Sequence, residues 1–288
     1  MVSLTTSIHR YAWHWNNQTF SIAYDTIGQG SPVLLLPAFS TVSSRSELQG
    51  IANRLAQRYQ VTTLDWLGFG EADRPALEYN PALFHQLLQD FVKDTFSQPI
   101  AIAAAGHAAG YALQLAQQPQ TCSKLVLIAP TWRGPLPTMG VNSSVRSFVR
   151  QLVRSPLLGQ ALYQANTTDW FLRLMYGRHV YVDQTRLTPE FIARKREITQ
   201  RPGARFAPAA FVTGKLDPVS DRQTFLNLIH SVRVPILVLI AEQAPPSSKA
   251  EMCALIELPN VTAQTLPGTL GLYEEYSEQV ADAMLSFL

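Results

Sequence analysis

The stretch IAIAAAGHAAG, residues 100–110, decides the fold. Its first six residues are continuously apolar, as expected for a parallel strand that is buried on both faces. Glycines at 106 and 110 then bracket a sharp turn into a helix, which we predict over residues 111–117. A side chain at either glycine would collide with neighbouring backbone. The stretch therefore predicts a buried strand, a tight turn and a helix in direct succession.

Short apolar runs alternate with helical patterns on both sides of this stretch, which indicates a mostly parallel sheet with helices on both faces. Residues 11–15 and 20–26 are predicted to form an opening hairpin. The other strands are predicted at residues 33–36, 61–64, 125–129, 236–240 and 261–266. The helices between them are predicted at residues 46–58, 81–96, 249–256 and 274–287, with Asn80 as N-cap of the second.

The alternation stops between residues 130 and 233, where short amphipathic helices are predicted at 145–153, 170–176 and 190–199. We therefore expect a core domain of residues 1–130 and 234–288, and a helical cap or lid of residues 131–233 inserted after the sixth strand. This helical insertion carries 15 Lys and Arg against 6 Asp and Glu. Such a surplus favours an anionic ligand, an acidic partner or a membrane surface, although solvated helix faces would also produce it.

Composition limits the remaining choices. With 47% hydrophobic and 15% charged residues, the chain is not of the disordered class, and a net charge of +2 gives no reason to expect nucleic acid. We find no signal-peptide pattern in residues 1–17, no membrane-spanning run, no metal-ligand spacing and no cofactor fingerprint. Cys122 and Cys253 are expected to be reduced, so we predict a cytoplasmic protein without metal or cofactor.

Three segments in order resemble the α/β-hydrolase superfamily. LLLPAF at residues 34–39 lies where the family's strand enters the oxyanion loop, and DWLGFGEADRP at residues 65–75 is close to its glycine-rich loop. GHAAG at residues 106–110 lies where its nucleophile elbow belongs. The resemblance extends from about residue 20 to residue 288. It implies a doubly wound, mostly parallel sheet of the eight-stranded type, with a helical lid after the sixth strand.

The three positions where the family keeps its catalytic triad hold other residues. The resemblance places the nucleophile at Ala108, the acid at Ala244 within AEQAP (residues 241–245), and the base at Leu270, just before Glu274. A methyl group at residue 108 can neither give a proton to a base nor attack a carbonyl. No histidine follows His230, so a small shift of the alignment supplies no base. Ordinary ester hydrolysis is therefore not expected.

Three functions remain open. The first is a catalytically silent relative that binds a hydrophobic or anionic small molecule, or a partner protein, and that keeps an enclosed pocket. The second is a hydrolase or lyase that uses relocated groups, Ser40 or His107. A third variant, a scaffold whose basic insertion docks an acidic partner or a membrane surface, predicts a closed pocket. The side chains proposed to line the site are Phe39, Ser40, His107, Ala108, Trp170, Glu242 and Tyr273.

Overall fold

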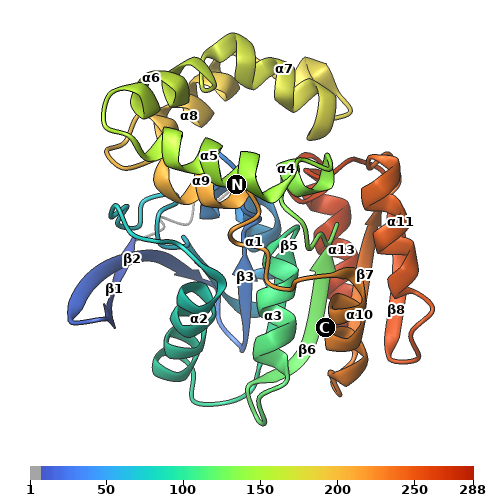
Figure 1. Ribbon diagram of the computed structural model, residues 1–288. Helices are drawn as coiled ribbons and strands as arrows, with labels where there is room; N and C mark the ends of the chain where they lie inside the picture. The colour runs from blue at the N-terminus through green and yellow to red at the C-terminus, as the bar shows by residue number, and fades with distance from the viewer. Residues whose placement is uncertain (1–7) are drawn as a thin grey trace.

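An eight-stranded sheet forms the centre of the molecule, in a computed structural model that describes residues 8–288 (Figure 1). The strands lie in the order β1-β2-β4-β3-β5-β6-β7-β8. Their bounds are β1 His9–Trp15, β2 Gln18–Ile27, β3 Ser31–Leu36, β4 Tyr59–Leu64, β5 Ile100–Ala105, β6 Cys122–Ile128, β7 Ile236–Ala241 and β8 Val261–Leu266. The pairs β1–β2 and β2–β4 are antiparallel, and the other neighbours are parallel. The predicted fold class is confirmed.

Burial along the strands follows from their place in the sheet. All six residues of β5 and of β7 are buried, which explains their uninterrupted apolar sequences. The edge strand β8 pairs with β7 alone, and residues 262–265 are exposed. The hydrophobic core therefore lies around the central parallel strands, whose carboxyl ends carry the turns discussed below.

Helices cover both faces of the sheet (Figure 1). One face carries α1 and α13, which pack together, and the other carries α2, α3 and α10. The bounds are α1 Gln49–Leu55, α2 Pro81–Thr95, α3 Ala108–Ala116, α10 Arg222–Ser231, α11 Pro246–Leu255, α12 Leu272–Glu275 and α13 Ser277–Phe287. The predicted cap of α2 is confirmed, because the Asn80 side chain accepts a hydrogen bond from the Leu83 N–H at 3.1 Å.

A run of helices separates β6 from β7, as the sequence predicted. These are α4 Pro135–Thr138, α5 Ser143–Arg154, α6 Leu158–Ala165, α7 Asp169–His179, α8 Pro189–Thr199 and α9 Phe206–Val212, with the short 3-10 helix η2 at Gln184–Arg186. The following helix, α10, packs on α3, and its Phe225 and Ile229 belong to the main core. The division into a core and a cap at residues 131 and 233 remains a prediction.

Several predicted helices differ from the observed ones, and the helix expected at 249–256, for example, begins at Pro246. The helix expected at 46–58 begins as the 3-10 helix η1, Arg45–Leu48, and α1 ends at Leu55. The helix expected at 111–117 begins at Ala108. The helix expected at 274–287 is interrupted at Tyr276, whose φ of −118° and ψ of 39° are not helical. Among residues 8–288, no helix is both long and apolar enough to cross a bilayer, and residues 1–7 of the N-terminal segment lie outside the described chain.

Candidate functional site

The turn after β5 has the geometry of a nucleophile elbow, in which a strand passes through one left-handed residue into a helix. Gly106 follows β5 with a φ of +51°, and α3 begins at Ala108. The Gly106 N–H donates to the carbonyl oxygen of Ile128 at 2.8 Å, and the Gly106 carbonyl accepts from the Ala109 N–H at 3.2 Å. These two bonds fix the turn to the end of β6 and to the first turn of α3.

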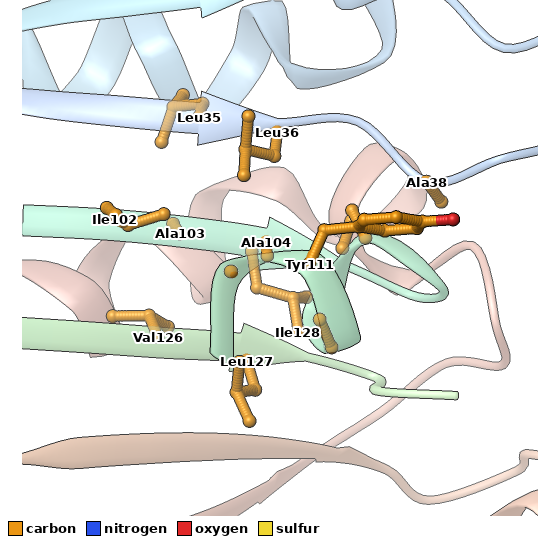
Figure 2. Packing of buried hydrophobic residues seen from close by; sticks show 14 of the residues in the cluster. Leu35, Leu36, Ala38, Ile102, Ala103, Ala104, Tyr111, Val126, Leu127 and Ile128 are labelled. Carbon is orange, nitrogen blue, oxygen red and sulfur yellow. The ribbon is translucent and has the colours of Figure 1, made fainter. Parts of the chain in front are cut away.

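Both glycines of the elbow are required by close neighbours. A Cβ at Gly106 would lie 3.0 Å from the Cβ of Ala38, and a Cβ at Gly110 would overlap the ring of Pro218. The neighbours are side chains in both cases, so the predicted collision with backbone is wrong in that detail. Figure 2 shows Ala38 beyond the carboxyl end of β3, with the ring of Tyr111 extending toward it.

His107, the predicted pocket residue inside the elbow, is only 1% exposed. Its Nε2 lies 2.9 Å from the Leu216 carbonyl oxygen and 3.4 Å from Oδ1 of Asp217. Burial lowers the pKa of His107 to about 4, and burial raises the pKa of Asp217 to about 7. The imidazole is therefore neutral at neutral pH. Because a carbonyl only accepts, Nε2 carries the proton and donates it to Leu216.

No local sequence pattern predicts the contact of Asp217 with the elbow, because Asp217 lies 110 positions after His107. The Asp217 carboxylate accepts a hydrogen bond from the Gly134 N–H at 2.8 Å. The Tyr111 hydroxyl donates to the same Leu216 carbonyl at 2.8 Å. Three long-range hydrogen bonds thus anchor the loop before α10 to the elbow and to the first residues after β6.

Aromatic rings fill the space beside the elbow. The Phe39 ring lies 5.9 Å from the His107 ring and 6.1 Å from that of Phe211 on α9, and His107 and Phe211 are 5.2 Å apart. Ala108 itself is fully buried. Further rings contact Phe39 on its other sides, namely Trp66, Phe69, Phe84 and Tyr111.

The predicted acid and base positions lie at the same edge of the sheet as the elbow. Ala244 is in the turn after β7 and Leu270 in the turn after β8, and parallel neighbouring strands end at a common edge. The two turns are tied together, because the Gln243 N–H donates to the Gly268 carbonyl at 2.9 Å. The Thr269 hydroxyl donates to the His179 carbonyl at 3.0 Å, which connects the second turn to the end of α7.

The remaining predicted pocket residues are dispersed. Ser40 is half-buried, and its Oγ accepts a hydrogen bond from the Val42 N–H at 3.2 Å. Within residues 8–288, no hydrogen bond joins Ser40 to His107. Glu242 is exposed, and Trp170 is 71% exposed on α7. The structure therefore brings Phe39, His107 and Ala108 together and leaves the Trp170 side chain outside this cluster.

Tyr273 is buried beside a charged cluster that the sequence analysis missed. Lys195 on α8 is 4% exposed, and its Nζ donates to Oε1 of Glu47 and to Oε1 of Glu274, each at 2.8 Å. Burial raises the pKa of Glu47 to about 7. Burial opposes the charge on Lys195, but the two carboxylates outweigh it and raise the lysine pKa. The cluster joins α8 to η1 and α12. Because 148 residues separate Lys195 from Glu47, no local sequence pattern reveals it.

Two cavities of the described chain lie away from the elbow. One, of about 280 Å³, is lined by Ser31, Tyr59, Lys124 and other residues at the amino ends of β3 and β4. The other, of about 400 Å³, lies beside α5 and is lined by Glu78, Arg150, Gln151, Arg154 and Ser155. Over residues 8–288, no group of three His, Cys, Asp or Glu side chains could hold a metal ion.

Comparison with known proteins agrees with this architecture. A mycobacterial protein of uncharacterized function, from Mycobacterium tuberculosis, is 29% identical over 117 residues, which is 40% of this chain and 33% of that protein. The 2-hydroxy-6-oxo-6-(2'-aminophenyl)hexa-2,4-dienoic acid hydrolase of Metapseudomonas resinovorans is 24% identical over 228 residues, covering 72% of this chain and 76% of the enzyme.

Among solved structures, a thermophilic esterase from Thermogutta terrifontis superimposes with a TM-score of 0.74. It is 18% identical, and the match covers 98% of this chain and 97% of the esterase. At that identity, the likeness shows the fold alone. The sequence profile described as "Alpha/beta hydrolase family" matches residues 33–283, which is most of the chain. The chain therefore belongs to the α/β-hydrolase family.

Proposed function

We propose that this chain is a catalytically silent member of the α/β-hydrolase family that acts by binding. The observation that carries the proposal is that the elbow has no nucleophile: the left-handed turn residue is Gly106, and the predicted nucleophile position is Ala108. Ala108 begins α3 two residues after Gly106, with His107 between them, and its side chain is fully buried. Acyl transfer by this fold needs a hydroxyl, thiol or carboxylate at the elbow, and a methyl group supplies none of them.

The acid and base positions support the same proposal. Ala244 and Leu270 occupy the turns after β7 and β8, which the hydrogen bond from Gln243 to Gly268 holds together. Both side chains are hydrocarbon, so neither can accept a proton or orient an imidazole. Loss of the whole triad leaves only the weak catalysis that an oxyanion hole and binding provide.

A relocated active site has less support. Catalysis by Ser40 with His107 as base would need a hydrogen bond between them of about 3 Å. Ser40 instead accepts from its own loop, and the His107 Nε2–H is engaged with Leu216. The low pKa of His107, caused by burial, also makes it a poor base near neutral pH.

Packing at the elbow favours binding at the outer surface of the protein over binding of an enclosed hydrophobic ligand. Phe39, His107 and Phe211 contact one another beside Ala108, and Trp170, the side chain of the insertion that was proposed to line the pocket, is exposed. In this proposal the helical insertion is a cap that closes the site, and its outer surface is the part of the protein that binds. A cytoplasmic location remains a prediction.

Ester hydrolysis by restored variants tests the proposal. The native protein and Ala108→Ser should both hydrolyse p-nitrophenyl esters no faster than buffer alone does. The single variant adds a hydroxyl but no base. The triple variant Ala108→Ser, Ala244→Asp, Leu270→His tests the assigned positions and should exceed the single variant. Turnover by the native protein that active-site titration assigns to a stoichiometric site would contradict the proposal. Turnover by Ala108→Ser alone would show that a histidine already serves this position.

A further inference from the structure

The helices of the insertion expose large apolar side chains to solvent. Among residues 8–288, every exposed large hydrophobic side chain except Ile8 and Ile256 lies between Met139 and Val182. The most exposed of them protrude almost fully: Leu157 is 84% exposed, Met139 75%, Trp170 71%, Leu158 65% and Phe148 64%. Concentration of such side chains in one segment marks an interaction surface, whereas single exposed apolar residues are ordinary.

The amphipathic helix α5 exposes part of its apolar stripe to solvent, while Val149, Leu152 and Val153 are half-buried. Val145 and Phe148, one turn apart, are 46% and 64% exposed, and no residue of α5 is buried. The arginines on the other side of the helix bind the body of the protein instead. Arg146 donates to the Thr213 carbonyl at 3.1 Å, and Arg154 donates to the Leu77 carbonyl at 2.5 Å. A surface helix normally buries its apolar stripe, so the exposed part of this stripe, Val145 and Phe148, lacks a partner.

The helices that follow extend the apolar surface. Leu157 and Leu158 stand at the start of α6, and Trp170 stands at the start of α7. Figure 1 shows α6 and α7 on the side of the molecule farthest from the sheet, with α5 beneath α6. We call the exposed apolar residues of α4 to α7 and of their connections the outer apolar surface. Its members are Met139, Val145, Phe148, Leu157, Leu158, Leu162, Trp170 and Met175.

Positive charge accompanies this surface. Between residues 139 and 182, the chain has five arginines and one acidic residue, Asp169. Asp169 already lies 3.4 Å from Arg196. Arg173 and Arg178, both exposed on α7, form no ion pair within residues 8–288. The outer apolar surface is thus flanked by free cationic groups that an anionic partner would neutralise.

We propose that the outer apolar surface binds the surface of an anionic lipid bilayer. Apolar side chains on a cationic, tryptophan-bearing helical surface suit the boundary between head groups and acyl chains. There Leu157, Leu158 and Phe148 enter the acyl region, Trp170 lies at the head groups, and Arg173 pairs with lipid phosphate. Anionic lipid attracts each arginine near the surface.

A second copy of the chain fits this surface less well, because two facing insertions would bring like charges together. An acidic protein with an apolar groove also fits less well, since the most exposed side chains protrude from consecutive helices. The proposal goes beyond the silent elbow and does not depend on it: ester turnover would leave membrane binding unaffected.

Vesicle binding with Trp170 as the reporter tests the proposal. Trp13, Trp66 and Trp132 are buried and Trp15 is half-buried, so Trp170 is the exposed member of the five tryptophans. The protein should sediment with vesicles of equal parts phosphatidylglycerol and phosphatidylcholine, with a blue shift of tryptophan emission. Binding to phosphatidylcholine alone should be at least about tenfold weaker, and 0.5 M salt should reduce binding to the anionic vesicles.

Leu157→Asp should weaken binding to the anionic vesicles by about tenfold or more, because it places a charge at the boundary between head groups and acyl chains. Ile256→Asp is the matched control. Ile256 is also exposed, at 45%, but it caps the carboxyl end of α11 and is not part of the outer apolar surface. Equal binding of both variants, or no sedimentation of the native protein, would overturn the proposal. A native dimer that Leu157→Asp dissociates, without lipid binding, would also overturn it and would assign the surface to a second copy.

Discussion

Replacing Lys195 by Met should destabilise the protein strongly, and more at high pH than at low pH. Lys195 is 4% exposed and donates to both Glu47 and Glu274 at 2.8 Å. Removing one partner of a buried ion pair leaves a charge without compensation, which costs about 3 to 5 kcal/mol. With an unfolding entropy of about 2.1 cal/mol/K per residue, a chain of this length should lose about 5 to 8 °C in Tm at pH 8.

The pH dependence follows from Glu47. Burial raises the pKa of this carboxyl to about 7 even with Lys195 present, from an ordinary value of 4.5. Without the lysine the folded-state pKa rises further. A carboxyl with a raised folded-state pKa takes up a proton on folding once the pH falls below that value. The loss of stability caused by Lys195→Met therefore becomes smaller as the pH falls from 8 to 4.5. At pH 5, most of the loss in Tm should have disappeared.

Differential scanning calorimetry at pH 8 and pH 5 measures this effect. Arg222→Met is the matched control: it breaks an ion pair of the same length, 2.8 Å, whose side chains are 53% and 29% exposed. It should cost less than about 1 kcal/mol. Adding Glu47→Gln to Lys195→Met should restore at least half of the lost Tm at pH 8. A loss below about 2 °C, or the same loss at both pH values, would refute the assignment of a buried charge cluster.

Three further outcomes follow from the described contacts. Asn80→Ala should cost about 1 kcal/mol in unfolding free energy, measured by urea denaturation, because the cap on Leu83 is lost; an equal loss in Asn80→Ser would contradict this. Gly106→Ala should destabilise the protein more than Gly140→Ala does. Both glycines have a positive φ, but only a Cβ at Gly106 would have neighbouring atoms within 4 Å. Melting temperatures in the opposite order would contradict the packing at the elbow. Iodoacetamide at pH 8 should label Cys253 before Cys122, whose buried thiol has a pKa raised to about 12, and mass spectrometry showing equal labelling would be inconsistent with this.

The sequence predicted the sheet well because its signals are local. Uninterrupted apolar runs identified β5 and β7, and the Asn80-Pro81 pair identified the start of α2. Helix ends were predicted less accurately where a single residue with non-helical φ and ψ ends the helix. Tyr276, which divides α12 from α13, has no sequence signature of a break.

The candidate site was predictable only in part. Motif spacing placed Ala244 and Leu270 in the turns after β7 and β8, and Ala108 at the start of α3, just past the turn after β5. The contact of His107 with Asp217 and the bridge from Lys195 to Glu47 join residues more than 100 positions apart, so no local pattern could reveal them. Trp170 was expected to line a pocket because the lid of the family covers a hydrophobic pocket over the elbow, but its side chain is 71% exposed on α7.

Labelling of the native protein with a serine-directed fluorophosphonate probe tests the central claim most directly. A silent elbow with Ala108 in place of a nucleophile predicts no more label than in heat-denatured protein, even at long exposure. Peptide mapping should then find no modified serine. Stoichiometric labelling of one serine, Ser40 above all, together with ester turnover that the label abolishes, would contradict the account and identify a relocated active site.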